Sequence, residues 1–291
     1  MSPGTTDVLD GPTACLTFDF DALSVWLGPY ASPTPSALSR GEFGARVGLG
    51  RILALLDREE IPASFYVPGH TVDTFPIECR EIIARGHEIG HHGYLHESPA
   101  DLEPAEERRV LERGLEAIER VVGTRPVGYR SPGWELSPVS VELLLEYGFE
   151  YDSSMMAQDF ELYRCRQGDI ARTDGPYVFG HEVDLVEVPV SWSLDDYPQM
   201  EFVKGFGLPG LSGYDKTLSM WTTDFDYMIE QVPAGVFGVT FHPQVVGRGG
   251  RMRILEGLIT HIKRTPDVTF RRVVDVVRDW REAHPLGEPS S

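Results

Sequence analysis

The sequence predicts an α/β fold built on a parallel sheet, either a barrel or a doubly wound sheet. Short apolar runs typical of strands alternate with helical patterns roughly seven times along the chain. Hydrophobic residues make up 41% of the 291 positions, enough for one large domain or two small ones with a sizeable core. Polar side chains recur directly after the apolar runs, and such folds gather these positions at one rim of the sheet.

The expected strands are short apolar runs that end at proline, glycine or a polar side chain. The second run, for example, stops at Pro68-Gly69, and the sixth alternates apolar and polar residues. Strands are expected at residues 13–18, 61–67, 87–90, 127–129, 149–152, 185–190 and 236–241.

The expected helices carry apolar residues at helical spacing, and the clearest begins at Pro104. Proline suits a first turn, Glu106 and Glu107 favour the positive end of the helix dipole, and Gly123 follows the apolar stripe. Helices are expected at 46–59, 77–85, 104–122, 138–147, 222–229, 254–263 and 271–281, with loops at 22–44 and 195–215. The loop at 22–44 is a candidate lid over the site that the next residues suggest.

Four of the nine histidines fall within residues 86–97, namely His87, His91, His92 and His96. His92 and His96 have the spacing that places two imidazoles on one side of a helical turn, where they would hold one metal ion. Catalytic zinc sites use three protein ligands, and the candidate for the third is the strand-end pair Asp19 and Asp21. A histidine pair alone more often makes ordinary hydrogen bonds, but buried carboxylates also need a partner.

Composition and charge exclude several classes of partner. With 26 basic and 45 acidic side chains the net charge is −19, which disfavours nucleic acid and anionic membranes. No export signal and no long apolar run are seen, and the three cysteines are widely spaced, so a cytoplasmic protein is expected. We expect a flexible leader at 1–12, a single catalytic domain at 13–283 and a flexible tail at 284–291.

Five segments together resemble the motifs of the polysaccharide deacetylase family, the NodB homology fold. They are Thr17-Phe18-Asp19-Phe20-Asp21, His92-Gly93-Tyr94-Leu95-His96, Arg130-Ser131-Pro132-Gly133-Trp134, Tyr151-Asp152-Ser153-Ser154 and Thr240-Phe241-His242-Pro243. The resemblance implies an irregular (β/α)7-type barrel. Secreted members carry adjacent aspartates, whereas Phe20 here separates Asp19 from Asp21. That spacing is similar to a cytoplasmic branch, which includes peptidoglycan-deacetylase-like proteins and metal-independent allantoinases.

The resemblance also implies a role for each motif residue. Asp21, His92 and His96 would hold a divalent metal ion, with Zn²⁺ expected first, and Trp134 would contact substrate. The four residues expected to act in catalysis are Asp19 as general base, Arg130 as its ion-pair partner, His242 as general acid, and Asp152 as the residue that orients or charges His242. Trp192 is expected in the core rather than in the site. The substrate would be an N-acetyl sugar or a small cyclic amide, and a homotetramer is expected.

The sequence leaves three alternatives open. A metal-independent ureide hydrolase is disfavoured by the retained aspartate and histidines. A non-catalytic binding protein on the same scaffold is disfavoured because neither the base nor the acid is missing. An aspartate with two histidines also suits non-haem iron, although Asp19, Arg130 and His242 fit hydrolysis better.

Overall fold

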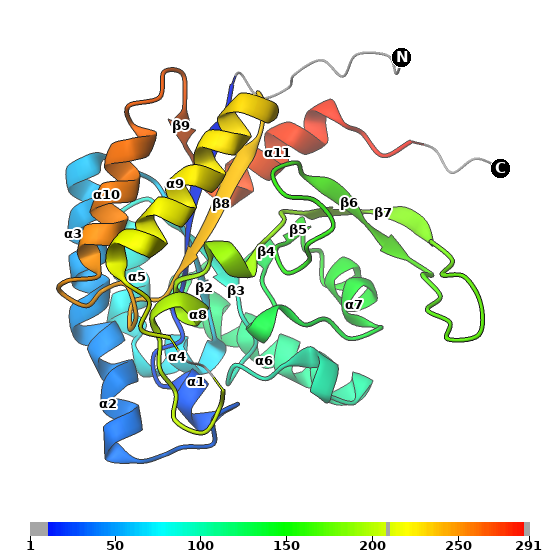
Figure 1. Cartoon of the computed structure of the whole chain (residues 1–291). Coiled ribbons are helices and arrows are strands. Elements are labelled where there is room, and N and C mark those ends of the chain that lie inside the picture. Colours follow the sequence, from blue (N-terminus) through cyan, green and yellow to red (C-terminus); the bar gives the residue numbers. More distant parts are fainter. Residues whose placement is uncertain (1–10, 208–209, 288–291) are drawn as a thin grey trace.

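The structure is a computed structural model that describes residues 11–207 and 210–287 (Figure 1). Residues 1–10 of the expected leader and 288–291 of the expected tail therefore lie outside the described residues. The fold class is as predicted, a mixed α/β barrel. Its sheet is curled but not closed, so that the first and last strands in the strand order do not pair with each other. Within the described residues, no helix combines the length and the apolar character that crossing a membrane requires.

The sheet follows the order β6-β7-β5-β4-β3-β2-β1-β8, with β9 paired to β1. All its ladders are parallel except the β6–β7 hairpin. The strands are β1 (Thr13–Asp19), β2 (Ser64–Val67), β3 (Glu88–His91), β4 (Gly128–Tyr129), β5 (Tyr151–Asp152), β6 (Tyr163–Gln167), β7 (His181–Glu187), β8 (Val236–Phe241) and β9 (Thr269–Phe270). Because parallel strands point the same way, their carboxyl ends meet at one rim.

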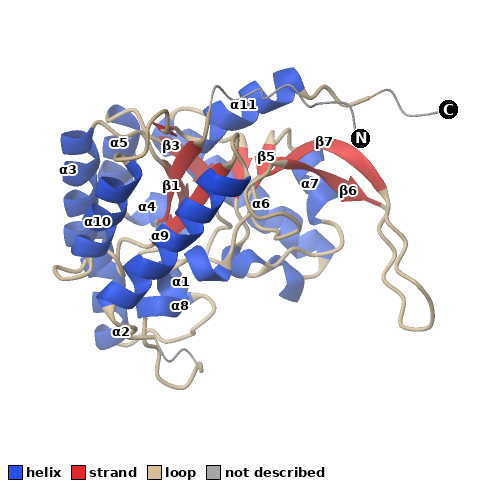
Figure 2. Ribbon diagram, turned by 45° about the horizontal axis from the view of Figure 1, so that its top comes forward, coloured by secondary structure: helices blue, strands red, loops and turns tan. Residues whose placement is uncertain are grey.

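Helices cover the outside of the curled sheet, while the β6–β7 hairpin extends away from them (Figures 1 and 2). The helices are α1 (Ser24–Leu27), α2 (Pro35–Phe43), a π-helix (Gly44–Gly48), α3 (Leu49–Glu59), α4 (Gly69–Thr74), α5 (Pro76–Ala84), α6 (Pro104–Val122), α7 (Ser140–Glu146), α8 (Asp196–Met200), α9 (Tyr214–Gln231), α10 (Met252–Ile262) and α11 (Val273–Ala283). Short 3₁₀ helices lie at Pro99–Asp101, Pro132–Trp134 and Trp192–Leu194.

The core is centred on β1, all of whose residues are buried. The Phe18 ring stacks on Phe65 of β2 and Phe241 of β8, with centroids 4.9 and 5.4 Å away. Burying each such side chain contributes roughly 1.5–3 kcal/mol, so the strand that ends in Asp19 is held from both sides. Helix α6 ends where expected, because Gly123 adopts a left-handed φ of 83° at its C-cap.

Several expected elements differ from the observed ones. The expected loop at 22–44 contains α1 and α2, and the expected loop at 195–215 contains α8. Strands β6 and β9 were not expected, and the strand expected at 185–190 runs instead from His181 to Glu187. In β6 the arginines at 164 and 166 interrupt the apolar pattern, and β9 is a two-residue strand that exists through its pairing with β1.

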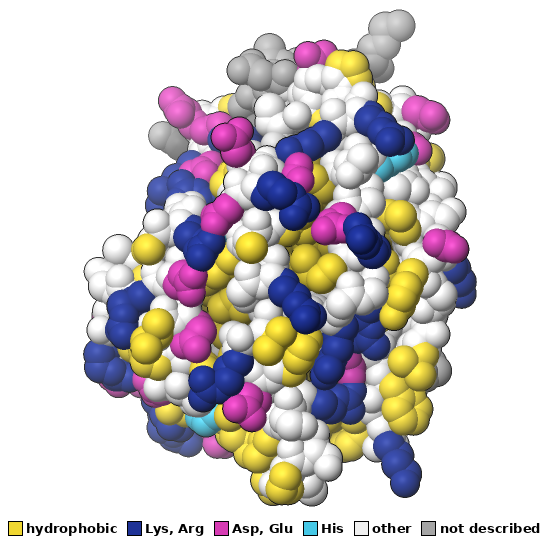
Figure 3. Space-filling view, turned by 90° about the vertical axis from the view of Figure 1, so that its left-hand side faces the viewer, with side chains coloured by type: hydrophobic (Ala, Val, Ile, Leu, Met, Phe, Trp, Pro, Cys, Tyr) yellow, Lys and Arg dark blue, Asp and Glu magenta, His cyan; other side chains and the backbone are white. Residues whose placement is uncertain are grey.

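The face covered by α2, α3 and α10 carries basic and acidic side chains intermixed (Figure 3). Ion pairs such as Lys263–Glu59, with Nζ and the carboxylate 2.9 Å apart, account for part of this pattern. This face is therefore of mixed sign although the net charge of the chain is −19.

Candidate active site

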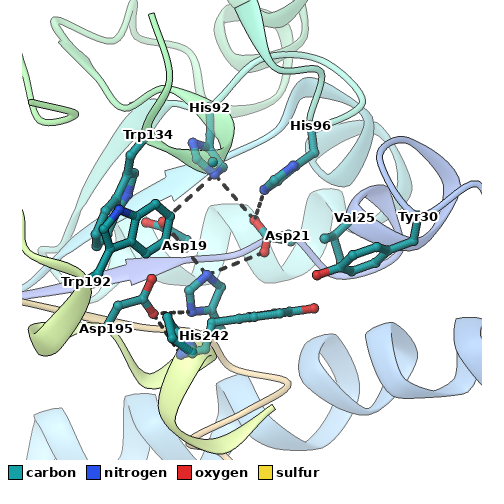
Figure 4. A pocket seen from close by; sticks show the side chains of 13 residues that line it. Asp19, Asp21, Val25, Tyr30, His92, His96, Trp134, Trp192, Asp195 and His242 are labelled. Atoms are coloured by element: carbon teal, nitrogen blue, oxygen red, sulfur yellow. Dashed lines mark hydrogen bonds and ion pairs between the residues drawn. The ribbon is translucent and has the colours of Figure 1, made fainter. Parts of the chain in front are cut away.

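The rim at the carboxyl ends of the strands gathers most of the predicted site residues. Asp19 ends β1, while His92, Arg130 and His242 each directly follow the last residue of β3, β4 and β8. A cavity of about 180 Å³ opens there (Figure 4). Its lining residues are Asp19, Asp21, Val25, Tyr30, His92, His96, Gly133, Trp134, Trp192, Asp195, Tyr197, Pro198 and His242.

Asp21, His92 and His96 converge on one side of this cavity. Asp21 Oδ1 lies 3.6 Å from His92 Nε2 and 3.7 Å from His96 Nε2. The two histidines do not lie on a helical turn as expected, because residues 92–96 form a loop after β3. Left-handed backbone at Gly93 (φ 70°) and His96 (φ 62°) turns this loop, so that the imidazoles face one another edge to face, 5.0 Å apart.

The atoms of Asp21, His92 and His96 that face one another are suited to bind a cation. His92 Nδ1 donates to the Arg130 carbonyl at 2.7 Å, which leaves the Nε2 lone pair directed at Asp21. Asp21 Oδ1 is buried and has no hydrogen-bond partner among the described residues. Burial lowers the pKa of both imidazoles, that of His96 to about 3, so both are neutral, as metal ligands must be. The same burial outweighs the nearby charge of His242 and raises the pKa of Asp21 to about 7.

Gln244, which was not predicted, fixes the other oxygen of Asp21. Its Nε2 donates to Asp21 Oδ2 at 3.2 Å. The loop after β8 that carries Gln244 packs directly on the π-helix, where a Cβ at Gly48 would collide with the Pro243 carbonyl. Gln244 therefore leaves only Oδ1 of Asp21 free.

Asp19 and Arg130 form the expected ion pair, with Nη1 donating to Oδ1 at 2.8 Å. The guanidinium is buried, stacks over the Tyr66 ring at 4.1 Å, and also donates to Ser153 and Thr17. Burial alone would raise the pKa of Asp19, but the charge and hydrogen bond of Arg130 together with the nearby imidazoles of His92 and His242 outweigh it and hold that pKa below its ordinary value. Oδ2 of Asp19 remains on the cavity side, 3.9 Å from Nε2 of both His92 and His242.

His242 faces the metal-ligand candidates from the opposite wall, with Nε2 3.7 Å from Asp21 Oδ2. Its Nδ1 lies 2.7 Å from Asp196 Oδ1 and 3.6 Å from Asp195 Oδ1. Burial would lower the pKa of His242, but the carboxylates of Asp195, Asp196 and Asp21 outweigh burial and raise it to about 10. The imidazole is therefore protonated at neutral pH.

The carboxylates beside His242 are those of Asp196 and Asp195, and not that of Asp152 as expected. Asp152 does not line the cavity; it accepts a hydrogen bond from Ser154 Oγ at 2.7 Å, and burial raises its pKa to about 6. The reason is the strand order, in which β5 is separated from β8 by β4, β3, β2 and β1. The adjacent acids at 195 and 196 were a visible signal, but nothing local showed that they return to β8, where Asp195 bridges Thr240.

Trp134 lines the cavity as expected, and Trp192, which was expected in the core, lies beside it. Their ring centroids are 4.3 Å apart, and 46% of Trp192 is exposed. His91, by contrast, is no ligand candidate, since both its ring nitrogens are engaged, by the Leu111 carbonyl and the Gly93 amide.

Comparisons with known proteins point to one family. The family model described as polysaccharide deacetylase matches residues 42–151, the part that contains His92, His96 and Arg130. The peptidoglycan deacetylase of Helicobacter pylori is 36% identical over 284 residues, which cover 92% of this chain and 95% of the relative. A peptidoglycan deacetylase-like protein of Gibberella zeae is 30% identical and covers 91% of this chain and 85% of its own length.

Solved structures show the same fold over the whole chain. The crystal structure of a candidate polysaccharide deacetylase from Mycobacterium smegmatis has a TM-score of 0.82 at 34% identity, covering 100% of this chain and 97% of that one. An allantoinase structure has a TM-score of 0.79 at 20% identity, covering 98% and 96%, a likeness of fold. Because relatives above 30% identity cover nearly the whole chain, the protein belongs to the polysaccharide deacetylase family and is a hydrolase of carbon–nitrogen bonds other than peptide bonds.

Proposed function

We propose that this protein is a metal-dependent hydrolase of the deacetylase or amidase type, in which Asp19 acts as general base and His242 as general acid. The observation that supports this most directly is the convergence of Asp21, His92 and His96. Their facing atoms lie within 4.8 Å of one another, and one of them, Asp21 Oδ1, is a buried oxygen with no hydrogen-bond partner in the described part of the chain.

Asp21, His92 and His96 would hold a divalent cation, with zinc expected first because three protein ligands and an open position suit catalytic zinc. When bound, such an ion lowers the pKa of a coordinated water towards about 7 and polarises the substrate carbonyl. The carbonyl of Arg130 fixes the tautomer of His92, and Gln244 fixes the rotation of the Asp21 carboxylate.

Asp19 takes the proton of the attacking water through Oδ2. Its other oxygen is occupied by Arg130, so the carboxylate stays ionised and points a single free oxygen into the cavity. General base catalysis of this kind typically contributes about 10²–10⁴-fold in rate.

His242 gives a proton to the leaving nitrogen from the opposite wall. Asp196 accepts from Nδ1, which orients the ring so that the Nε2 proton faces the cavity. An amine leaves poorly as an anion, so this proton is needed before the carbon–nitrogen bond breaks.

The substrate we propose is an N-acetyl sugar or a small cyclic amide. The H. pylori relative is named a peptidoglycan deacetylase, which supports an acyl-amine substrate. A cytoplasmic location, self-association into a homotetramer and a single catalytic domain at 13–283 stay predictions.

The test is hydrolysis by protein stripped of metal and then reloaded. We expect a panel of N-acetyl sugars, cyclic amides and ureides, followed by product mass, to show turnover that chelation abolishes and zinc restores. Turnover that survives exhaustive chelation would contradict the metal-dependent proposal and favour the metal-independent ureide hydrolase.

A further inference from the structure

Acidic side chains outnumber cationic ones among the described lining residues of the cavity, where His242 alone carries a positive charge. Asp19, Asp21 and Asp195 line it, and none of its described lining residues is lysine or arginine. The residues outside the described ranges contain no lysine or arginine either, so none of them supplies one. Any positive charge at the site therefore belongs to the groups already described.

Those positive charges are already matched. Arg130 does not line the cavity, and its donors are directed to Asp19, Thr17 and Ser153. His242 is held against Asp196, and a divalent ion in the proposed position would face the carboxylates of Asp21 and Asp19. A substrate carboxylate entering here would lose its hydration and gain no unpaired cation, so its entry is unfavourable.

The outer wall of the cavity is instead flat and apolar. The indoles of Trp134 and Trp192 lie beside Asp19 and face the metal-ligand candidates (Figure 4). Trp134 is held with a left-handed φ of 55°, a conformation that is unfavourable for an aromatic residue and persists only where the surroundings enforce it. Trp192 is 46% exposed, so a ligand that packs on it would cover apolar surface that otherwise faces water.

The cavity is also small. Its volume of about 180 Å³ lies below the roughly 300–1,000 Å³ typical of sites for drug-sized ligands, so it suits a compact ligand. A single ring carrying the reacting amide matches this space better than several units of a polymer.

Building on the proposed function, we propose that the site selects uncharged, single-ring amides, and that Trp192 sets this specificity by packing on the face of the ring. Amides that carry a carboxylate beside the reacting group are rejected. Trp192 acts on binding and not on the proton transfers, because it contacts neither Asp19 nor His242 by any hydrogen bond among the described residues.

The experiment uses matched substrates with the zinc-loaded full chain. The first pair is dihydrouracil and dihydroorotate, which differ by one carboxylate, with the methyl ester of dihydroorotate as the uncharged control for size. The second pair is N-acetylglucosamine and N-acetylmuramic acid. In whichever pair is hydrolysed, we expect kcat/KM to be at least about a hundredfold higher for the uncharged member, and the ester to behave as uncharged.

Variants then assign the selectivity to Trp192. Trp192→Ala should raise KM for the uncharged substrate about three- to tenfold with little change in kcat, and Trp192→Phe should restore it. Trp192→Arg should lower the ratio of kcat/KM for the uncharged substrate to kcat/KM for the anionic one at least about tenfold, because the added positive charge favours binding of the anionic substrate. Phe179→Ala, which truncates an aromatic residue that is 70% exposed near the start of β7, is the matched control and should change nothing.

Failure of this inference is distinguishable from failure of the proposed function. Equal kcat/KM for charged and uncharged members, with hydrolysis intact, would overturn the selectivity alone, as would an unchanged KM in Trp192→Ala. If the wild type hydrolyses no amide, the proposed function fails, and calorimetric binding of each pair still decides selectivity. Equal dissociation constants for the anionic and the uncharged member of a pair would then overturn the proposed selectivity.

Discussion

Two compact groups of carboxylates and imidazoles lie on opposite sides of the cavity. The first group is Asp21, His92 and His96, and the second is Asp195, Asp196 and His242. In the first group, Asp21 Oδ1 and His96 Nδ1 are buried without a partner among the described residues, and burial lowers the pKa of both histidines. In the second group, Asp196 accepts from the ring and backbone nitrogens of His242, and the carboxylates raise the pKa of that histidine to about 10.

The difference shows that residue type alone does not assign chemistry in this site. A neutral imidazole beside an unpaired carboxylate is arranged to accept a cation. A protonated imidazole whose second nitrogen is already bonded to a carboxylate is arranged to give up a proton. The following predictions test this distinction, from the largest expected effect to the smallest.

Asp21→Asn should abolish metal binding and turnover. Asp21 is the only carboxylate of the first group. Its loss should lower metal affinity by more than the 10–100-fold that typically follows the loss of a residue hydrogen-bonded to a metal ligand. Metal content after dialysis and kcat are the measurements. Asp195→Asn is the matched control and should keep its metal, so metal loss in that variant instead would reverse the two assignments.

Asp196→Asn should lower kcat by roughly 10²-fold, part of the 10²–10⁴-fold that a general acid contributes, without changing metal content. The reason is the 2.7 Å contact between Asp196 and His242 Nδ1. Asp152→Asn should have a much smaller effect, since Asp152 contacts Ser154 and lies outside the cavity. A larger loss at Asp152 than at Asp196 would restore the role expected from the family resemblance.

Gln244→Leu should weaken metal binding by about 10–100-fold, while kcat at saturating metal stays close to wild type. Gln244 supports Oδ2 of Asp21, so its loss frees the carboxylate to rotate. Calorimetric titration of zinc into the stripped variant measures the change. Unchanged affinity would show that the carboxylate is oriented by its surroundings without this donor.

His87→Asn tests the effect of burial on a histidine away from the cavity. Burial lowers the pKa of His87 to about 4, so the folded state resists its protonation. Stability from the neutral ring is present above the unfolded pKa of about 6.5 and is lost as the pH falls towards 4. Between pH 7 and 5, urea unfolding should show wild type losing about 1–2 kcal/mol more than His87→Asn, allowing for partial screening. Equal losses would mean that burial does not depress this pKa.

The regular parts of the fold could be predicted from the sequence. Strand β8 lies at the predicted residues 236–241 and α6 between its predicted proline and glycine, because an apolar run or a capped amphipathic helix is a local signal. The short helices between 22 and 44 were not expected, although Thr34 caps α2 and Pro35 occupies its first turn.

The site was predictable where its residues follow strands. Asp19, Asp21, His92 and His242 reach the same cavity because parallel strands end at a common rim. Trp192 and Asp196 were missed because they lie in short helices, and Gln244 because it lies in a loop. The return of these segments to the rim depends on tertiary packing. Even His92 and His96 face each other through left-handed backbone in a loop rather than through helical periodicity.

The most direct measurement is an anomalous-difference map from crystals of the zinc-loaded protein, recorded on both sides of the zinc absorption edge. It should place one ion about 2.0–2.2 Å from Asp21 Oδ1, His92 Nε2 and His96 Nε2. An ion held by Asp195, Asp196 and His242 would contradict the assignment. So would the absence of any peak within the cavity.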